Sequence, residues 1–332
     1  MMSNTAQIIK QCRSLPGVTV TEGDGCVELR LSCREGSGRM RFIPLFPGIT
    51  LVLISVSAPS WPAPVPEDCA PEAKGPLIVN YCTSGRCELV LNDNRSVFMT
   101  AGHISLTERF ARSEYVYPGR AYEGIELFID PEPAEGGAIL LRDHFGVDIS
   151  ALREAYCPAG ETFIAKLALP EELLERLGGC AAQRGAIRDT GAKTAMIDLL
   201  ALLQHGGTGP GMEPLTYYTR SQVEMAKQIE AVVSGDLSRQ HTAREFAALF
   251  SVSESSVKNY FRGVYGQSIL QYATQRKMLH AAELLTDTAL PVIEIASRVG
   301  YENQSKFSAV FRKRFGVSPR EYCRSHRLLG EK

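Results

Sequence analysis

The spacing of hydrophobic residues divides the chain into a β-rich part followed by a helical part. Between about residues 18 and 131, short apolar runs alternate with Gly, Pro and Asn, which is typical of strands joined by tight turns. The clearest runs are 49–56, 77–81, 87–91 and 124–129, and Asn92, Asp93 and Asn94 indicate a hairpin turn after the third run. Many short strands of this kind predict a sandwich or barrel.

Beyond residue 168 the apolar positions follow the helical period of 3.6 residues. They predict a helical hairpin within 166–205. Its apolar face has two interpretations of equal weight: it pairs with a second subunit, or it only covers the β-rich domain. The two stripes that form this face are Leu173, Leu174 and Leu177, and then Met196, Leu199, Leu200 and Leu203.

Residues 206–217 are rich in Gly and Pro, which predicts a flexible linker. No strand pattern leads into this cluster, and no Gly-Lys-Ser or Gly-Lys-Thr follows it. A nucleotide-binding loop is therefore not indicated.

Two short helices joined by a tight turn are predicted over 242–264. Thr242 and Glu245 form a capping box for the first helix, and Ser253 is a favourable N-cap for the second. A pair of this kind is a helix-turn-helix, whose second helix enters the major groove of DNA. The inner face of that second helix consists of Val257, Tyr260 and Phe261, and its outward positions are Ser255, Lys258, Asn259 and Arg262.

The same plan recurs about 50 residues later, over 291–315. Pro291 suits the first turn of a short helix, and Gly300 permits the sharp turn after it. Asn303 can cap a second helix that ends at Gly316. The outward candidates of this helix are Gln304, Ser305, Lys306 and Arg312.

One long helix, about 269–286, separates the two units. About 20 residues at a rise of 1.5 Å give roughly 30 Å, which is close to the roughly 34 Å of one turn of B-DNA. A rigid spacer of this length would place two recognition helices in successive major grooves.

Apolar, Gly and Pro residues in this part of the chain keep a long fixed spacing that closely resembles the signature of the AraC/XylS family of transcription regulators. The resemblance implies a seven-helix DNA-binding domain over 218–328 and a cupin-like β-barrel over 1–165. It also implies double-stranded DNA and RNA polymerase as partners, and activation more often than repression. Leu290 departs from the family pattern, which often has a Ser or Thr cap there, so some fraying of that helix start is expected. The residues that carry the resemblance are Arg276, Lys277, Met278, Ala281, Leu284, Leu285, Ile293, Ile295, Ala296, Val299, Gly300, Tyr301, Gln304, Ser305, Phe307, Phe311, Arg312, Lys313, Phe315, Gly316, Val317, Ser318, Pro319 and Tyr322.

The charge distribution fits a DNA-binding C-terminal part. The whole chain has a formal net charge of −1, but residues 217–332 carry 17 Lys and Arg against 11 Asp and Glu, a net of +6. The remaining residues carry 19 basic and 26 acidic side chains, a net of −7. A basic module joined to an acidic one is typical of a nucleic-acid binder with a second, non-binding domain.

Base edges in the major groove are read by hydrogen bonds, with Arg or Lys favouring guanine and Asn or Gln favouring adenine. Arg262 and Arg312 stand further along each second helix, and we expect them to contact phosphates or flanking bases. The expected base-reading residues are Ser255, Lys258 and Asn259 in the first unit and Gln304, Ser305 and Lys306 in the second.

The β-rich part has no pattern that indicates catalysis or metal binding. His103 and His144 stand alone, and the chain has no His-x-His, so we expect no metal, no cofactor and no enzyme activity. Strand alternation places Arg86 and Glu88 on one face, either lining a cavity or facing solvent. Together with Tyr81, they are the candidates for binding a small-molecule effector.

The nine cysteines are scattered, and no pair forms a Cys-x-x-Cys. With no export signal, this favours reduced thiols in a bacterial cytoplasm. No apolar run reaches the roughly 18 residues that a membrane span needs. The sequence therefore predicts an α+β multidomain, nucleoid-associated homodimer that activates transcription in response to a small molecule. The alternative is a regulator controlled by a protein partner or by thiol oxidation.

Overall fold

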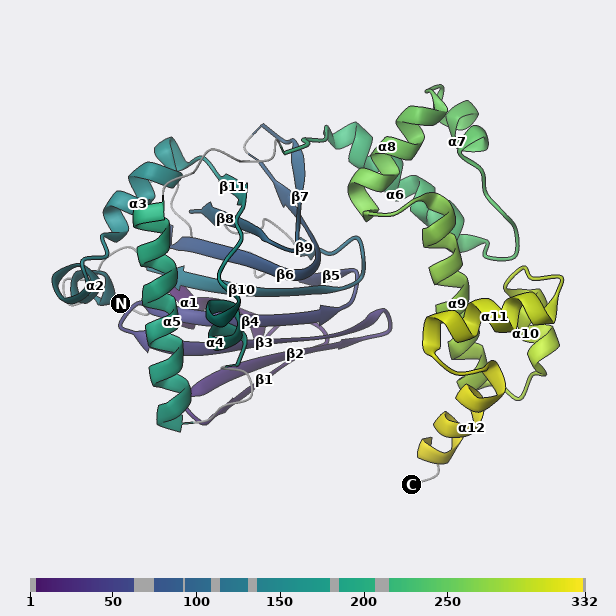
Figure 1. Ribbon diagram of the computed structural model, residues 1–332, viewed down its shortest axis with the longest axis horizontal. Helices are drawn as coiled ribbons and strands as arrows, with labels where there is room; N and C mark the ends of the chain where they lie inside the picture. Colours follow the sequence, from purple (N-terminus) through teal and green to yellow (C-terminus); the bar gives the residue numbers. More distant parts are fainter. Residues whose placement is uncertain are drawn as a thin grey trace. The chain divides into compact units, whose positions relative to one another are not determined.

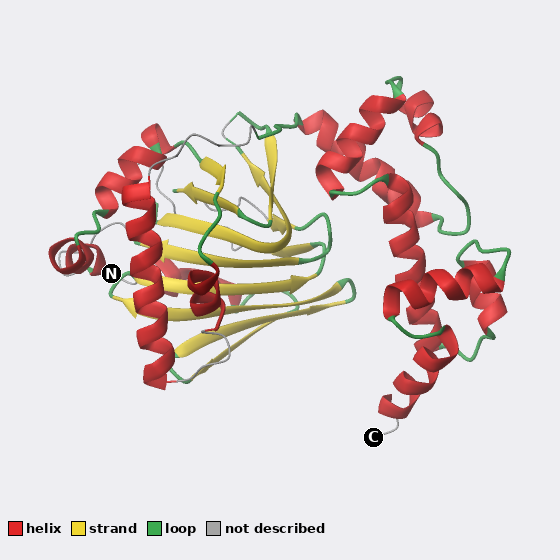
Figure 2. Ribbon diagram, in the orientation of Figure 1, coloured by secondary structure: helices red, strands yellow, loops and turns green. Residues whose placement is uncertain are grey.

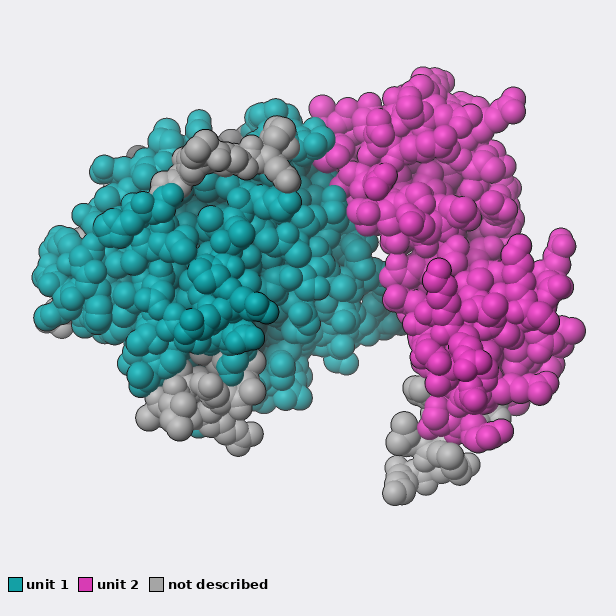
Figure 3. All heavy atoms as spheres, viewed as in Figure 1, with its two compact units in different colours: residues 1–217 teal, residues 218–332 magenta. Residues whose placement is uncertain are grey.

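The computed structural model describes residues 4–62, 75–91, 93–108, 114–130, 136–179, 185–206 and 215–330. The chain divides into two compact units, Met1–Tyr217 and Tyr218–Lys332 (Figure 3). The predicted linker residues 207–214 lie outside the described residues, as do Asn92, Cys69 and Cys180.

Unit 1 is built on an antiparallel sheet (Figures 1 and 2). Its strands are β1 (Val18–Gly23), β2 (Cys26–Cys33), β3 (Gly36–Phe46), β4 (Ile49–Ser57), β5 (Ser60–Pro62), β6 (Leu77–Val90), β7 (Ser96–Thr100), β8 (His103–Thr107), β9 (Glu114–Val116), β10 (Tyr122–Ile129) and β11 (Phe163–Lys166). The hydrogen-bonded order is β1-β2-β3-β4-β10-β6-β8-β11, with β7 paired to β6 and with β5 and β9 forming a separate pair. The predicted β-rich N-terminal domain is confirmed. Because β1 and β11 end this order, the described strands form an open sheet.

Alternation along the strands gives the sheet two apolar faces. One face carries rows such as Leu51, Leu127 and Val79, which lie directly opposite one another on β4, β10 and β6. The helices α3 (Ile149–Tyr156), α4 (Glu171–Gly179) and α5 (Gly185–Gly206) contribute buried residues to this core. The other face packs against α1 (Asn4–Cys12). A further helix, α2 (Gly137–Phe145), adds Leu141 to the first core.

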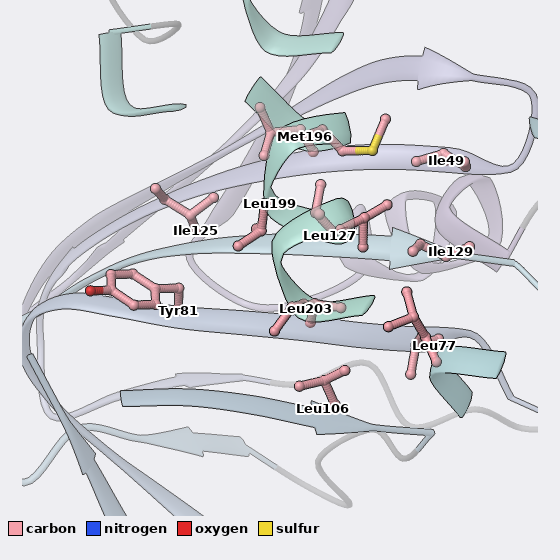
Figure 4. Close-up of a cluster of buried hydrophobic side chains, with 14 of the residues drawn as sticks. Ile49, Leu77, Tyr81, Leu106, Ile125, Leu127, Ile129, Met196, Leu199 and Leu203 are labelled. Atoms are coloured by element: carbon pink, nitrogen blue, oxygen red, sulfur yellow. The ribbon is translucent and has the colours of Figure 1, made fainter. Parts of the chain in front are cut away.

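The stripes predicted within 166–205 lie in the core of unit 1. Figure 4 shows Met196, Leu199 and Leu203 of α5 beside the strand residues that they cover. Leu173 and Leu177 of α4 are buried in the same cluster. These apolar side chains therefore cover the sheet. Dimerisation through the hairpin stays a prediction, and it would have to use other side chains.

The other face of the sheet buries a chain of three polar side chains. Tyr122 donates a hydrogen bond from its hydroxyl to Asn80 Oδ1 (2.6 Å), and Asn80 donates from Nδ2 to Glu126 Oε1 (2.7 Å). Burial of the Glu126 carboxyl group raises its pKa to about 7. An uncharged carboxyl group satisfied by an amide is a stable arrangement inside an apolar core.

Strand β6 is longer than the sequence pattern predicts. Runs 77–81 and 87–91 are parts of one strand, which continues through Gly85 at a φ of +82°. A Cβ atom on Gly85 would lie 2.1 Å from the Ala121 carbonyl oxygen, so only glycine fits there. The pairing of β6 with β10 shifts register between Glu123 and Gly124. This irregularity interrupts the apolar pattern without ending the strand.

The regular elements that the structure describes in unit 2 are all helices, as predicted for the C-terminal domain. Its helices are α6 (Arg220–Gly235), α7 (Ala243–Phe250), α8 (Glu254–Tyr265), α9 (Ile269–Asp287), α10 (Val292–Arg298), α11 (Gln304–Phe315) and α12 (Pro319–Gly330). The predicted capping boxes are present, from Thr242 to Glu245 and from Ser318 to Glu321. Pro291 is the N-cap of α10 and not a residue of its first turn, so that prediction was wrong by one position.

Helix α9 runs from the α6–α8 group of helices to α10 and α11 (Figure 1), and it belongs to two hydrophobic cores. Its first half places Ile269 and Tyr272 among residues of α6, α7 and α8. Its second half places Met278, Ala281 and Leu285 among residues of α10 and α11. Each helix-turn-helix therefore packs on its own half of one continuous helix.

Candidate DNA-binding interface

Helix α8 is held by its N-cap and by one apolar face. Ser253 accepts a hydrogen bond from the Ser256 backbone N–H (3.1 Å). Val257 and Phe261 are fully buried against residues of α6, α7 and α9, and Val264 is also fully buried. The helix ends at Gly266, whose φ of +75° permits the αL C-cap.

The opposite face of α8 is polar and exposed. Ser255, Asn259 and Arg262 are exposed at positions i, i+4 and i+7, so they form one ridge along the helix. Lys258 is also exposed, but its Nζ lies 3.3 Å from the Glu254 carboxylate on the same helix. Of the four residues predicted from the sequence, three therefore form the ridge and Lys258 lies beside it.

Helix α11 repeats this arrangement. Asn303 caps it by accepting hydrogen bonds from the N–H groups of Ser305 (2.8 Å) and Lys306 (3.1 Å). Phe307 and Phe311 are fully buried, and Gly316 ends the helix at a φ of +79°.

The predicted residues of α11 differ in exposure. Ser305, Lys306 and Arg312 are exposed, whereas Gln304 is half-buried and lies toward the packed side of the helix. Sequence reasoning missed Lys313, which is exposed and lies seven residues, two helical turns, after Lys306. The helical period applied from Lys306 would have found it. The last turn of α11 is strongly basic because it contains Arg312, Lys313 and Arg314.

The loop before the first helix-turn-helix lies against the turn of the second. A Cβ atom on Gly300, in the turn before α11, would lie 2.1 Å from the carbonyl oxygen of Ser238, in the loop before α7. The Nζ of Lys277 lies 5.7 Å from the centre of the Tyr301 ring. Burial lowers the pKa of Lys277, and the nearby Asp236 carboxylate opposes that shift. Within unit 2, these contacts restrict the orientation of the second helix-turn-helix relative to the first.

The helix between the units has the length that the sequence predicts. The 19 residues of α9 span about 28 Å at a rise of 1.5 Å per residue. Tyr272 fixes its first half by donating a hydrogen bond to Glu230 Oε1 of α6 (2.6 Å).

The effector candidates in unit 1 fall in two places. Tyr81 lines a cavity of about 530 Å³, and its hydroxyl donates a hydrogen bond to the Leu167 carbonyl (3.2 Å). Arg86 and Glu88 do not line this cavity. The guanidinium of Arg86 lies 5.5 Å from the Phe98 ring centre, and Glu88 accepts a hydrogen bond from Ser96 (2.8 Å).

The described residues contain no group of three or more His, Cys, Asp or Glu side chains that could hold a metal ion. His103 Nδ1 lies 2.9 Å from the Thr100 hydroxyl, so a residue three positions earlier in the chain forms a hydrogen bond with the His103 ring. Among the helices that the structure describes, none is long and apolar enough to cross a membrane.

Several thiols are buried. Burial raises the pKa of Cys12 and Cys157 to about 11 and that of Cys82 to about 12. Cys33 is exposed. Since the thiolate is the reactive form, the buried thiols are poor nucleophiles.

Comparison with known proteins places the resemblance in unit 2. Residues 246–325 match a protein family described as a helix-turn-helix domain. The HTH-type transcriptional activator RhaR of Cronobacter sakazakii is 31% identical over 115 residues, which cover 35% of this chain and 37% of that protein. RhaR of Yersinia pseudotuberculosis is 41% identical over 69 residues, 21% of this chain and 24% of that protein. This chain thus spans well under half the length of these relatives.

A solved structure, the C-terminal domain of AraT, a response regulator from Geobacillus stearothermophilus, is 34% identical. The match covers 30% of this chain and 84% of that one, with a TM-score of 0.29. The family match encloses α8, α9 and α11, and with them the residues that carry the AraC/XylS pattern. Unit 2 therefore contains a helix-turn-helix domain of the AraC/XylS type.

Proposed function

We propose that this protein is a sequence-specific DNA-binding transcription regulator. One observation carries the proposal: α8 and α11 present exposed polar ridges from two cores that share the single helix α9. A helix fits the major groove, and recognition helices about one duplex turn apart can enter successive grooves on one side of the DNA.

In this proposal the ridge residues have two roles. Ser255 and Asn259 on α8, with Ser305 and Lys306 on α11, read base edges by hydrogen bonds. Arg262 and Arg312 contact phosphates, which set the register of the protein on the duplex and make affinity fall with salt.

The related proteins RhaR and VirF are named transcriptional activators. We infer that this protein also activates transcription, as a homodimer in a bacterial cytoplasm and through contact with RNA polymerase. In this proposal unit 1 senses a small molecule, which acts by favouring one arrangement of the linked units. Control by oxidation of Cys12, Cys82 or Cys157 is not favoured, because these thiols are buried with raised pKa values.

Selection from a random duplex library with the full chain tests the proposal. The expected result is enrichment of a site with two elements separated by about one helical turn, 10–10.5 base pairs. Arg262→Ala and Arg312→Ala should each weaken binding to all duplexes and reduce the slope of log affinity against log salt by about one.

Lys10→Ala is the matched control, because it removes an exposed positive charge from α1 in unit 1. It should leave affinity and salt slope unchanged. Absence of any enriched sequence, or of any salt-dependent binding, would overturn the proposal.

A further inference from the structure

The cavity beside Tyr81 lies on the sheet face that α4 and α5 cover. Figure 4 shows Tyr81 at one end of the buried row along β6, with Leu77 at the other end. Residues of α5 cover the middle of this face. The cavity of about 530 Å³ is lined by Tyr81 and by residues of α4, and by none of the described residues of α5. A volume of this size holds a small organic molecule.

The floor of the cavity is an apolar row that crosses three strands. Leu53 of β4 lies directly opposite Ile125 of β10, which lies directly opposite Tyr81 of β6. Leu174 of α4 also lines the cavity. The row is therefore an apolar surface on which a ligand can pack, with an aromatic ring at one end.

The next row toward solvent is polar and carries one charge of each sign. Arg39 of β3 lies opposite Ser55 of β4, which lies opposite Glu123 of β10. Neighbouring strands are about 4.8 Å apart, so the backbone positions of Arg39 and Glu123 are separated by roughly 10 Å. Both side chains line the cavity.

These two charges are available to a ligand. Arg41 also lines the cavity, but its guanidinium forms an ion pair with the Glu28 carboxylate, with Nη2 3.0 Å from Oε2. In contrast, neither Arg39 nor Glu123 forms an ion pair with another side chain in the part of the chain that the structure describes. The cavity thus holds a cation and a carboxylate on opposite sides of a serine, above an apolar floor, and Glu175 of α4 adds a second carboxylate to its lining.

We propose that this cavity binds a small zwitterion with an apolar body, such as a free amino acid. The anionic group of the ligand pairs with Arg39, its ammonium group pairs with Glu123, and its apolar part lies on Leu53, Ile125 and Tyr81. That such a ligand is the effector of the regulator rests on the function proposed above. The binding of the ligand does not rest on that function, because binding is measured without DNA.

Calorimetric titration of the full chain with the twenty standard amino acids tests this inference. L-phenylalanine is accompanied by 3-phenylpropionate, which lacks the amine, and by 2-phenylethylamine, which lacks the carboxylate. At least one amino acid with an apolar side chain should bind at one site per chain. Each one-charge analogue should bind at least about tenfold more weakly, since each loses a charge-assisted hydrogen bond.

Single substitutions then separate the two charges. Arg39→Gln should weaken binding of the amino acid at least about tenfold without further weakening the amine analogue, and Glu123→Gln should spare the carboxylate analogue instead. Arg30→Gln is the control. Arg30 lies opposite Arg39 on the neighbouring strand and does not line the cavity.

A filling substitution tests the location. Gly178 of α4 lines the cavity, and a Cβ atom there would have no neighbour within 4 Å, so Gly178→Phe can occupy the space without a backbone clash. It should abolish ligand binding while the chain keeps its circular dichroism spectrum. Failure of all twenty amino acids to bind, or equal loss in Arg30→Gln and Arg39→Gln, would overturn the inference, whatever the outcome of the DNA selection.

Discussion

The two recognition helices present different chemistry from equivalent positions. An offset of 50 residues aligns Ser255 with Ser305 and Arg262 with Arg312, but it aligns Asn259 with Ala309. The middle of the first ridge is therefore an amide, which suits adenine. The middle of the second ridge is a methyl group, which suits the thymine methyl. We therefore expect the two helix-turn-helix units to read different sequences, and the DNA site to be a direct arrangement of two unlike elements.

Asn259→Ala should weaken binding to the selected duplex by about 1–3 kcal/mol, roughly 5- to 150-fold, because a bidentate contact to adenine is lost. Binding to random duplex should change little. Competition gel shifts with both duplexes measure the difference. Lys258→Ala is the matched comparison on the same helix, since Lys258 pairs with Glu254. Equal loss on selected and random DNA in Asn259→Ala would contradict the base-reading role.

The buried carboxyl group of Glu126 makes stability depend on pH. Its folded pKa of about 7 lies above the ordinary 4.5, so the folded state favours the protonated form. The stabilisation is full below pH 4.5 and is lost as pH rises through 7, by about 3 kcal/mol on the scale of 1.36 kcal/mol per pKa unit. Glu126→Gln keeps a neutral acceptor for Asn80 and should remove this dependence.

Urea unfolding at pH 5 and pH 8 measures the effect. The unfolding free energy of Glu126→Gln relative to the native chain should rise by about 2 kcal/mol between these two pH values. Glu161→Gln, at an exposed position, should give no such rise. A constant difference for Glu126→Gln at both pH values would show that the group is ionised when folded.

At the scale of the elements, the helix ends of unit 2 were predictable because they depend on local chemistry. Ser253, Asn303 and Gly316 act through their own side chains or dihedral angles, and each cap appears where the sequence places it. Strand β6 was not predictable as one strand, since its continuity depends on the close approach of Ala121 to Gly85. That contact comes from a segment distant in sequence.

Gly300→Ala should destabilise unit 2 more than Gly316→Ala does. Both glycines have similar positive φ angles, +76° and +79°, so both substitutions cost about 1 kcal/mol of backbone strain. Only at Gly300 would the added Cβ meet a neighbour, the Ser238 carbonyl oxygen. Urea unfolding should therefore show an additional loss of about 1–3 kcal/mol in Gly300→Ala. Equal losses would mean that the loop before α7 moves away freely.

At the scale of the whole molecule, the division into two units agrees with the change in charge near residue 217. The identity of unit 2 followed from sequence, because its motif residues keep a fixed spacing along the chain. The cavity of unit 1 could not be predicted from the sequence. Arg39, Glu123 and Gly178 come together only through the order of the strands and the position of α4. Of the three predicted effector residues, Tyr81 alone lines it.

A fragment comprising residues 218–332 should fold and bind the selected duplex with a salt dependence like that of the full chain, because the recognition helices and both cores lie within it. Its thermal unfolding should be a single transition, since α9 takes part in both cores. Calorimetry and gel shifts on the fragment test this. Two separate transitions, or loss of specific binding on removal of unit 1, would contradict the expectation.

The membership of α9 in two cores has a consequence for how such regulators acquire new targets. One helix-turn-helix cannot be replaced by that of a relative through cuts at its flanking turns. Half of α9 would then pack against a core with a different sequence. Replacing exposed ridge residues one at a time is the change that leaves both cores of α9 intact.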